Sequence, residues 1–318
     1  MLEILEAGGL LTVQDSGRRG WQKFGVPISG PMDWFAHCAA NALVGNDLNA
    51  AVLELGFGEV TLRAHRDCVI GVTGAGFVAS TYMWTFPLWT SFYVRSGWNV
   101  RMIKQGDGNW AYLAVAGGME VEAALGSRST YLRAGLGRNL QAGDLLKTGK
   151  PSQALNDLAA RTLSETKKPA YSPTPVIEVI QGPQSDWFTQ EGLDTFYGCS
   201  YSVSTSSDRM GYRLAGSPVA SSRGADLLSE GMVSGSIQVP ANGQPIVMMA
   251  DCGTTGGYPK IANVITADLP VLAQIAPRTG LIRFKTTTVE EAQSRYRRML
   301  KDIDDGIEKV EDDSNFAQ

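Results

Sequence analysis

The chain has 318 residues, of which 43% are hydrophobic and 19% charged, and its formal net charge is −4 at pH 7. This composition predicts a folded protein with a substantial core, long enough for two domains, and excludes a globally disordered chain. Residues 289–318 hold nine acidic and five basic side chains, whereas the rest of the chain balances at 23 of each. A neutral body with an acidic tail does not favour nucleic acid as a partner.

The N-terminal sequence, MLEILEAGGLLTVQD, has neither the basic start nor the apolar centre of a signal peptide. No apolar run approaches the roughly 18 residues that a membrane span needs. The four cysteines are widely spaced without a CxxC pair, which favours free thiols in a reducing compartment. We therefore expect a cytoplasmic protein that does not associate with a membrane.

Short β-branched or aromatic runs, separated by turn residues, fill the first third of the chain. They are LLTVQD, VLELGF, VTLRA, CVIGVTG, FYVRS, WNVRMIK and WAYLAVAGG. Their regular spacing is typical of a β-barrel or β-sandwich. The segment GPMDWFAHCAANALVGND interrupts them and predicts a helix that ends near Gly45. Its apolar stripe consists of Phe35, Ala36, Ala39, Ala40 and Leu43.

A change in composition predicts the domain boundaries. Residues 151–175 are polar, flanked by proline and poor in strand patterns, so we expect a linker between a first β-barrel domain at 1–150 and a second at 176–287. A second short helix is expected in SDWFTQEG, at 185–192. Residues 288–318 are expected to form a C-terminal helix and an acidic tail.

The C-terminal helix has its own start signal. Thr288 and Glu291 have the spacing of a capping box. The apolar face that follows is made of Ala292, Tyr296, Met299, Leu300 and Ile303. We expect this helix to pack against the body of the protein.

The sequence lacks the motifs that usually mark metal sites, serine nucleophiles, P-loops and biotin attachment. His37 lies inside the first predicted helix and His65 in a charged turn, so neither has the spacing of a metal pair, and no metal site is expected. The chain contains no G-x-S-x-G nucleophile elbow and no P-loop. Cys252 follows an apolar run, where a thiol is usually buried rather than reactive. An Ala-Met-Lys-Met sequence is absent, so we expect no covalently bound biotin on this chain.

Polar side chains beside glycine recur in five segments. Arginine next to glycine suits a carboxylate or a phosphate, because the guanidinium binds two oxygens and glycine lets the ligand approach. One such segment alone is more typical of a surface turn, but five together predict a small anionic ligand. The segments are TVQDSGRRGW, GSRSTYLRAG, SSDRMGYRL, LLSEGMVSGSIQVP and DCGTTGGYPK.

The last of these segments follows the apolar run PIVMMA. Gly253, Gly256 and Gly257 permit unusual dihedral angles and close backbone approach. Two threonines and a tyrosine offer hydroxyl groups, and Lys260 is expected to be an exposed, mobile cation. Such a loop suits an anion held by backbone amides, and it equally suits a tight turn of a β protein.

Longer stretches occur in the order and spacing of one protein family. They are TVQDSGRRGW, GPMDWFAHCAANALVGN, AVAGGMEVEAALGSRSTYLRAG, SEGMVSGSIQVPANGQPIVMMAD and TTGGYPKIANV…DLPVLAQIAPRTG. From residue 1 to about 285 the chain resembles the allophanate hydrolase subunit 2 family, which includes the C subunit of 5-oxoprolinase and the carboxyltransferase half of urea amidolyase. The resemblance implies a mainly β fold: two cyclophilin-like β-barrel domains with a few short helices and a C-terminal helix.

The resemblance also implies an activity. It points to a subunit of an ATP-dependent 5-oxoprolinase, which converts 5-oxoproline, ATP and water to glutamate, ADP and phosphate. The implied partners are a kinase-inhibitor-like subunit 1 and a third oxoprolinase subunit, with ATP shared among them. Phosphorylation of the lactam oxygen activates an amide that resists direct cleavage, and this step needs cations for the phosphate and hydroxyls for the lactam.

We assign roles on this basis by residue type. The expected catalytic residues are two carboxylates, as base or metal-orienting groups, and one cation: Asp15, Asp251 and Lys260. The expected substrate contacts are Arg18, Arg128, Arg209, Ser229, Glu230, Gln238, Thr254, Thr255, Gly256, Gly257 and Tyr258. The segments around Asp15 and Thr254 are expected to line one pocket between the domains, where ligand sites are common.

Two alternatives stay open. One is a biotin-dependent carboxyltransferase of the urea amidolyase type, and the other is a non-enzymatic regulator that binds the subunit 1 protein. The segment STYMWTFPLWTSFYVRSGW, with Trp84, Trp89 and Trp98, is expected in a barrel core, and exposure would instead make it an interface candidate. The sequence departs from the family at Cys252 and Gly253, where Arg-Gln is usual, and this bears on the substrate contacts.

Overall fold

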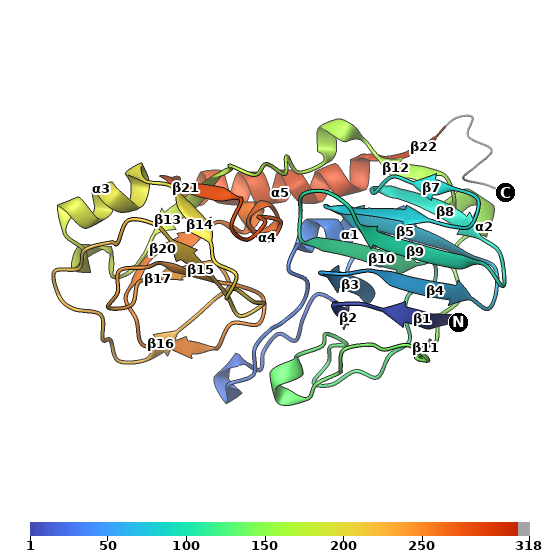
Figure 1. Ribbon diagram of the computed structural model, residues 1–318, viewed down its shortest axis with the longest axis horizontal. Helices are drawn as coiled ribbons and strands as arrows, with labels where there is room; N and C mark the ends of the chain where they lie inside the picture. Colours follow the sequence, from blue (N-terminus) through green and yellow to red (C-terminus); the bar gives the residue numbers. More distant parts are fainter. Residues whose placement is uncertain (311–318) are drawn as a thin grey trace. The chain divides into compact units, whose positions relative to one another are not determined.

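The chain folds into two compact units that do not follow its linear order. A computed structural model describes residues 1–310. Unit 1 comprises Met1–Arg18, Asp33–Pro169 and the described residues from Met299 onward, and unit 2 comprises Arg19–Met32 and Ala170–Arg298 (Figure 1). Each unit therefore takes segments from separate parts of the chain.

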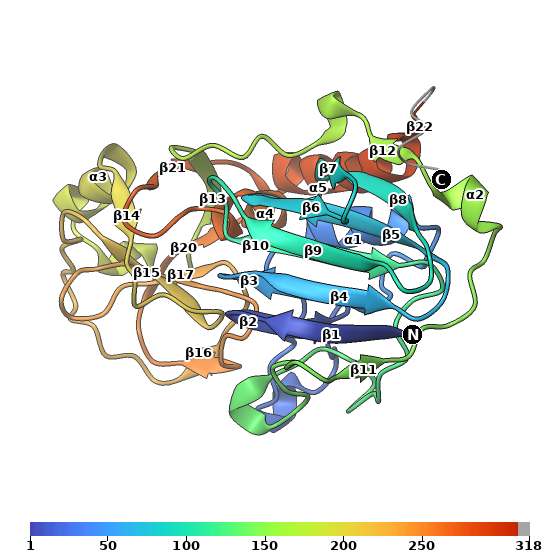
Figure 2. The ribbon, with the colours of Figure 1, turned by 45° about the vertical axis from the view of Figure 1, so that its right-hand side comes forward.

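Unit 1 contains two antiparallel sheets. The six-stranded sheet has the order β11-β1-β4-β9-β6-β7, and β1, β4 and β9 run side by side in it (Figure 2). Its strands are β1 (Leu2–Ala7), β4 (Val60–Ala64), β6 (Phe77–Ser80), β7 (Thr85–Phe86), β9 (Asn99–Lys104) and β11 (Leu145–Leu146).

The second sheet of unit 1 has the order β2-β3-β10-β5-β8-β12-β22. Its strands are β2 (Leu10–Gln14), β3 (Val52–Gly56), β5 (Cys68–Gly74), β8 (Thr90–Val94), β10 (Trp110–Val115), β12 (Arg161–Leu163) and β22 (Ile307–Lys309). One hydrophobic cluster takes side chains from both sheets, with Ile4 and Leu62 from the first and Leu53 and Leu113 from the second. The core of unit 1 therefore lies between the two sheets.

The predicted first helix is confirmed as α1 (Trp34–Leu43). Asp33 caps it by accepting a hydrogen bond from the main-chain N of Ala36, and Gly45 follows with a φ of 68°. All five residues of the predicted apolar stripe are buried. The helix packs on β5 so closely that a Cβ at Gly71 would lie 2.9 Å from the carbonyl oxygen of Ala40.

The segment expected to be a linker has structure of its own. Residues 151–175 contain α2 (Leu155–Leu158) and β12, and β12 pairs with β8 through Thr162 and Thr90. Unit 1 accordingly extends to Pro169. The polar composition hid this strand, because only Leu158 and Leu163 in the two elements are deeply buried.

Unit 2 is built on a closed barrel with the strand order β13-β20-β17-β18-β15-β14-β21. These strands are β13 (Val176–Gln181), β14 (Tyr201–Val203), β15 (Gly211–Ala215), β17 (Ser236–Gln238), β18 (Ile246–Met248), β20 (Lys260–Val264) and β21 (Leu281–Thr286). A separate two-stranded ribbon joins β16 (Glu230–Gly231) to β19 (Thr255–Gly256). The predicted mainly β fold with few helices is confirmed, and its closed barrel lies in unit 2.

The remaining helices are short except at the C-terminal end. The helix expected at 185–192 is a 3-10 turn, η4 (Ser185–Trp187), followed by α3 (Gln190–Gly198), because Thr189 caps the latter through the main-chain N of Gly192. The other short ones are α4 (Leu269–Ala273), η1 (Gln22–Phe24), η2 (Leu132–Ala134), η3 (Glu165–Lys167) and η5 (Thr266–Asp268).

The predicted C-terminal helix is α5 (Val289–Asp305). Its capping box is confirmed, because the main-chain N of Glu291 donates to Thr288 Oγ1 at 3.2 Å and the main-chain N of Thr288 faces Glu291 Oε2 at 3.5 Å. The expected acidic tail lies mostly at 311–318, outside the described residues. None of the helices within residues 1–310 is both long and apolar enough to cross a bilayer.

Candidate functional site

Asp15 follows β2 in unit 1 and is fully engaged by hydrogen bonds. Its carboxylate accepts from Ser127 Oγ at 2.5 Å, Ser129 Oγ at 2.7 Å, the main-chain N of Arg128 at 2.6 Å and the main-chain N of Gly17 at 2.9 Å. Burial works to raise the pKa of Asp15, but these hydrogen bonds outweigh it and hold the pKa below its usual value. Asp15 is therefore a stable anion and a weak base.

Two of the predicted arginines lie around the same segment. Arg18 is buried, and its Nη2 donates to the carbonyl oxygen of Ser129. The side chain of Arg128 is exposed, and its Nε donates to the carbonyl oxygen of Val121 at 2.9 Å. The structure thus brings Asp15, Arg18 and Arg128 together, with Arg128 as the accessible cation.

A row of buried polar side chains crosses the sheet beneath α1. Cross-strand pairing places Thr12 beside Glu54, Glu54 beside Tyr112, and Tyr112 beside Thr73. Tyr112 Oη donates to Glu54 Oε2 at 2.8 Å and accepts from the main-chain N of Asp33 at 2.8 Å. Sequence reasoning missed this row, although the alternation of polar and apolar residues in LLTVQD and VLELGF is its signal.

His37 of α1 is buried against this row. Its ring lies edge-on to that of Tyr112, with 6.4 Å between centroids. Burial lowers the pKa of His37 to about 4, so the imidazole is neutral at physiological pH. His37 therefore supplies no positive charge to an anionic ligand.

Lys260 is buried at 5% exposure, so the expectation of an exposed, mobile cation is wrong. Its Nζ donates to Glu230 Oε2 at 2.8 Å and to the carbonyl oxygen of Gly231 at 3.3 Å. Gln184 joins the cluster, because its Nε2 donates to Glu230 at 2.9 Å and its Oε1 accepts from the main-chain N of Lys260 at 3.1 Å. Lys260 opens β20 inside a β protein, so its stem and ammonium are enclosed by neighbouring strands.

This cluster fixes the charge of Glu230. The hydrogen bonds from Lys260 and Gln184 lower the pKa of Glu230, so its carboxylate is ionised at neutral pH. Gln184 was absent from the predicted site residues, because it lies 76 residues from Lys260 in sequence and no motif marks it.

Arg209 and Asp251 form a bidentate ion pair in unit 2. Arg209 Nε donates to Asp251 Oδ2 at 2.8 Å and Nη2 to Oδ1 at 3.0 Å. Nη2 also donates to the carbonyl oxygen of Gly30 at 2.6 Å, which ties the segment Arg19–Met32 to the barrel of unit 2. Both predicted residues are buried, and each neutralises the charge of the other.

The glycine-rich loop after Asp251 forms one edge of the β16–β19 ribbon, where Glu230 lies opposite Gly256 and Gly231 opposite Thr255. None of its three glycines has a positive φ, so unusual dihedral angles are not the reason for them. Gly256 packs closely against its neighbours, since a Cβ there would lie 2.6 Å from Gln238 Nε2 and would displace the end of that side chain. A Cβ at Gly257 would lie 3.0 Å from the carbonyl oxygen of Leu227.

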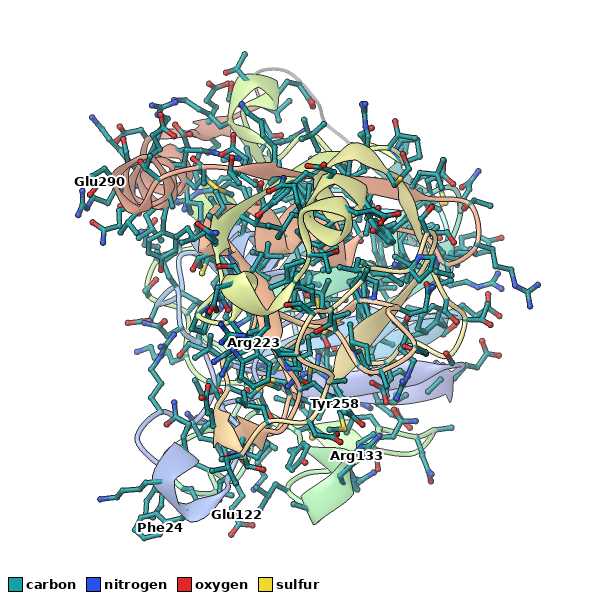
Figure 3. The ribbon with its side chains drawn as sticks, turned by 90° about the vertical axis from the view of Figure 1, so that its left-hand side faces the viewer. Phe24, Glu122, Arg133, Arg223, Tyr258 and Glu290 are labelled. Carbon is teal, nitrogen blue, oxygen red and sulfur yellow. The ribbon has the colours of Figure 1, made fainter. Side chains whose placement is uncertain are left out.

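The predicted hydroxyl groups differ in exposure. Tyr258 is 41% exposed at the surface of unit 2 (Figure 3), and Thr255 and Ser229 are exposed as well. Thr254 is half-buried. Gln238 is buried, with Nε2 donating to the carbonyl oxygen of Tyr258 at 3.2 Å. Ser229, Thr255 and Tyr258, in or beside the ribbon, are therefore open to solvent, whereas Lys260 is buried and pairs with the partly exposed Glu230.

The departure at Cys252 and Gly253 changes the chemistry of the loop. Cys252 is buried, and burial together with Asp251 raises the pKa of its thiol to about 11, so it is a protonated, unreactive group. Gly253 is not crowded, since the nearest atom to an added Cβ is 3.5 Å away. A Cβ therefore fits at position 253 without steric conflict.

The predicted residues fall into two groups, one in each unit: Asp15, Arg18 and Arg128 in unit 1, and the others in unit 2. The single pocket expected for them stays a prediction. Within residues 1–310, no three His, Cys, Asp or Glu side chains are placed to hold a metal ion.

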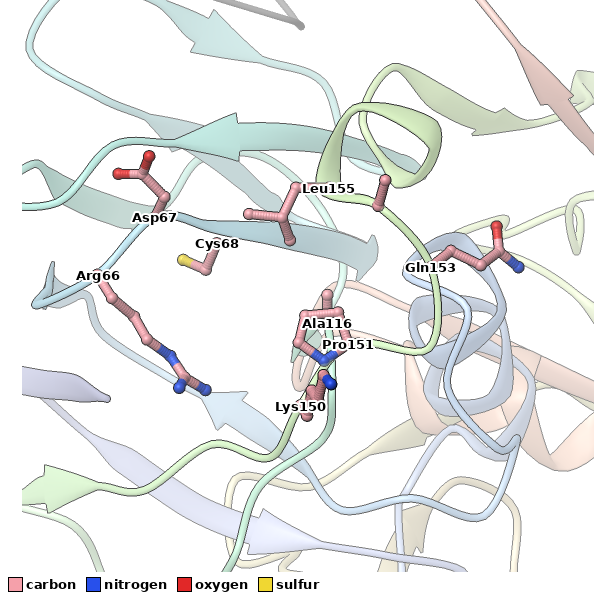
Figure 4. A pocket seen from close by; sticks show the side chains of 9 residues that line it. Arg66, Asp67, Cys68, Ala116, Lys150, Pro151, Gln153 and Leu155 are labelled. Carbon is pink, nitrogen blue, oxygen red and sulfur yellow. The ribbon is translucent and has the colours of Figure 1, made fainter.

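A pocket of about 320 Å³ lies elsewhere in unit 1 and includes none of the predicted residues (Figure 4). Arg66 and Lys150 supply cations there, and Ala116, Pro151 and Leu155 supply an apolar wall. Arg66 already makes hydrogen bonds within the protein, because its Nη2 donates to the carbonyl oxygens of Thr148 and Gly149. The pocket is therefore separate from the predicted chemistry.

The tryptophans of the aromatic segment have different environments. Trp89 is buried and Trp98 packs against the core of unit 1, so the core expectation is confirmed for both. It is wrong for Trp84, which is 38% exposed in the turn between β6 and β7, beside Tyr82 at 98%. The turn leaves the sheet edge, and its side chains therefore do not reach the core.

Comparisons with known proteins agree with this fold. Residues 24–286 match the family described as carboxyltransferase domain, subdomain A and B. The chain is 38% identical to the C subunit of 5-oxoprolinase from Escherichia coli (strain K12) over 94% of this chain and 97% of that protein. It is 37% identical to the C subunit of 5-oxoprolinase from Haemophilus influenzae over 99% of this chain and all of that protein.

A solved structure shares the whole fold. The crystal structure of the Kluyveromyces lactis urea amidolyase matches 100% of this chain with a TM-score of 0.89 and 27% sequence identity. This chain spans only 20% of that much longer protein.

Proposed function

The chain belongs to the carboxyltransferase domain family, and we propose that it acts as the C subunit of an ATP-dependent 5-oxoprolinase complex. The observation that carries the proposal is the near end-to-end match with two proteins that bear the name of this 5-oxoprolinase component. The match to urea amidolyase covers only a small part of that protein. The share of each relative that is covered and the sequence identity therefore both favour a 5-oxoprolinase subunit over a urea amidolyase.

The proposed reaction opens the lactam of 5-oxoproline at the expense of ATP. The lactam oxygen attacks the γ-phosphorus, ADP leaves, and water adds to the activated ring carbon. The C–N bond then breaks, which gives a γ-glutamyl phosphate and the free amine, and a second water hydrolyses this acyl phosphate to glutamate and phosphate. A lactam amide is stabilised by resonance, so phosphorylation supplies the leaving group that direct hydrolysis lacks.

The residues of the β16–β19 ribbon support this chemistry by their type and exposure. The hydroxyls of Thr255, Tyr258 and Ser229 are accessible, and we propose that they position the substrate. Lys260 donates to Glu230 of the same ribbon, and we propose that its charge, shared with Glu230, stabilises negative charge that develops on the phosphoryl group.

The first cluster has a different proposed role. Because the carboxylate of Asp15 already accepts four hydrogen bonds, we propose that it fixes the loop that carries Arg128 rather than acting as a base. The exposed Arg128 is then the cation in unit 1 that meets an anionic ligand. We further propose that ATP and the catalytic machinery are shared with partner subunits, since both relatives are named as one subunit of a larger enzyme.

Reconstitution tests this function directly. The chain is combined with its partner subunits, and ADP and glutamate are measured with and without 5-oxoproline. We expect ADP release that depends on 5-oxoproline and matches glutamate one to one. A Thr255→Ala, Tyr258→Phe double variant should lower the rate at least tenfold, while Ser234→Ala, an exposed serine outside the ribbon, should leave it unchanged. Absence of 5-oxoproline-dependent ADP release would rule the function out.

A carboxyltransferase of the urea amidolyase type is the second candidate, and the structural match to urea amidolyase over the whole of this chain favours it. In that case the chain would receive carboxylate from a carboxybiotin carried by a partner. The assay is bicarbonate- and ATP-dependent carboxylation of urea in the presence of a biotin carboxylase with its biotinyl domain. Turnover of urea without turnover of 5-oxoproline would reverse the assignment.

A further inference from the structure

The pocket of about 320 Å³ in unit 1 has two cations on its lining that the proposed reaction does not use. Arg66 and Lys150 are both exposed at this pocket, so a ligand can reach them (Figure 4). Within residues 1–310 neither side chain forms an ion pair with a carboxylate. Like charges on one lining repel each other, so a bound anion lowers the electrostatic energy of the pocket.

Arg66 is held in place by uncharged acceptors. Its Nη2 donates to the carbonyl oxygens of Thr148 and Gly149 at 2.7 and 2.6 Å, and to Thr148 Oγ1 at 2.5 Å. Its Nε and Nη1 make no hydrogen bond within residues 1–310. The guanidinium is therefore fixed without being neutralised, and it keeps donors for a ligand while losing little freedom when the ligand binds.

The pocket wall that carries Lys150 is also fixed. The main-chain N of Gly149 donates to the carbonyl oxygen of Gly118 at 3.1 Å. A Cβ at Gly117 would lie 2.6 Å from the carbonyl oxygen of Gly149, so the two backbone segments are in close contact. Lys150 and Pro151 follow this contact directly along the chain. Closely packed backbone thus shapes this wall without any ligand.

The other polar groups of the lining leave it positively charged. Asp67 is turned away from the guanidinium of Arg66 (Figure 4), and its two oxygens accept from Tyr93 Oη and the main-chain N of Ser96, both at 2.8 Å. Burial raises the pKa of the Cys68 thiol to about 12, so this group is neutral. Two cations and one carboxylate give the lining a net charge of +1 at pH 7.

The size and the apolar wall of the pocket narrow the class of ligand. Its volume is at the lower end of the roughly 300–1,000 Å³ of small-molecule sites, which suits a small acid better than a nucleotide. Ala116, Pro151 and Leu155 are apolar, and an inorganic anion would leave them without a partner. A single negative charge on a short hydrocarbon chain matches both the charge and the wall.

We infer that this pocket binds a short aliphatic carboxylate, with a chain of about four to six carbons. The carboxylate accepts hydrogen bonds from Arg66 and Lys150. The hydrocarbon chain packs on Ala116, Pro151 and Leu155. The inference is independent of the proposed function, because the pocket is lined by none of the residues proposed for substrate binding or catalysis.

Titration of the full chain with hexanoate tests the site. In ¹H–¹⁵N spectra, the amide signals of Cys68 and Lys150 should shift with a saturable, single-site dependence on hexanoate. Lys150→Glu reverses one charge and should raise the Kd at least tenfold, and Lys150→Met should raise it about fivefold. The Tm of both variants should equal that of the wild type, since Lys150 is exposed and makes no hydrogen bond within residues 1–310.

Lys147→Glu is the matched control, because it makes the same charge change three residues away, at an exposed lysine outside the lining. Its Kd for hexanoate should stay within twofold of the wild type. An equal loss of binding in the Lys147 and Lys150 variants would show general electrostatic attraction rather than a site. Absence of saturable shifts up to about 10 mM hexanoate would likewise show that the inference is wrong.

A series of ligands tests the two halves of the pocket separately. Each added methylene should tighten binding about two- to fourfold, so hexanoate should bind at least about fourfold more tightly than butanoate. Hexanol has the same chain without the charge and should bind at least tenfold more weakly than hexanoate. If inorganic phosphate binds as tightly as hexanoate, or butanoate and hexanoate bind equally, the aliphatic carboxylate is the wrong class of ligand.

Discussion

Lys260 is enclosed by its partners, so its removal should affect folding directly. Lys260→Ala takes away the cation that faces Glu230 and a donor to the carbonyl oxygen of Gly231. We expect the free energy of unfolding to fall by about 1–2 kcal/mol, a value kept low because the side chain of Glu230 is 42% exposed and reaches water. Urea unfolding measures the change. Lys301→Ala is the control, since that lysine is 77% exposed in its side chain and should cost less than about 0.5 kcal/mol.

The lowered pKa of Asp15 leads us to expect that the stability of the protein depends on pH. Its folded-state pKa is lowered from 3.8, so the stabilisation is present above pH 3.8 and is lost as the pH falls through the folded-state pKa. Asp15→Asn removes this titration and presents an amide to several donors. We expect a loss of about 2–3 kcal/mol in the free energy of unfolding at pH 7. The gap between wild type and variant should close below pH 3.8.

Unfolding of both proteins by urea at a series of pH values measures that gap. Glu122→Gln, a change at an exposed carboxylate of the same unit, is the control and should follow the wild type throughout. A constant gap from pH 7 to pH 3 would show that the ionised form of Asp15 is not what stabilises the loop at 127–129.

At the scale of elements, Arg295 links α5 to the barrel of unit 2. Arg295 Nη1 donates to Glu178 Oε2 and Nη2 to Asp268 Oδ1, both at 2.6 Å. Burial raises the pKa of Asp268, even though Arg295 and a backbone hydrogen bond oppose this. Arg295 thus compensates a carboxylate that is 3% exposed.

Arg295→Met should leave that carboxylate buried without its cation. We expect the free energy of unfolding to fall by about 1–3 kcal/mol at pH 7.5, less than for a fully buried pair because the arginine side chain is 38% exposed. A raised folded-state pKa means that stability is lost as pH rises through it, so the variant should recover towards pH 4 as Asp268 is protonated. Urea midpoints at the two pH values measure this. Arg297→Met, at an exposed position of the same helix, should show neither effect.

At the scale of the whole molecule, the chain crosses between its two units several times. Residues 19–32 belong to unit 2, and the carbonyl oxygen of Gly30 binds Arg209 there. Strand β22 belongs to unit 1, where Leu163 pairs with Ile307 and Arg161 with Lys309. A short segment of the first half, Arg19–Met32, therefore completes unit 2, and the described residues from Met299 onward complete unit 1.

This arrangement predicts the result of cutting the chain once. A protease site inserted between Pro173 and Thr174, which are both exposed, would give two fragments that each hold a part of both units. We expect the fragments to co-elute in gel filtration under native conditions and to separate only in denaturant. Elution as two independent folded domains would contradict this division into interleaved units. It would favour two consecutive domains at 1–150 and 176–287.

The sequence by itself determined the features that depend on neighbouring residues. The apolar stripe of α1, its cap at Asp33, and the capping box of Thr288 and Glu291 each lie within a few residues, so local spacing is enough to predict them. The alternation of the strands and the long motifs likewise predicted a mainly β protein and its family.

Only the tertiary structure decided the environment of the site residues. Arg209 meets Gly30 across 179 residues, Asp15 meets Ser129 across 114, and Lys260 meets Gln184 across 76. Local patterns carry no information about such pairs. The sequence therefore did not predict that Lys260, expected to be mobile, is buried. Burial and long-range hydrogen bonds determine which polar groups are free to act, and they arise only when distant segments fold together.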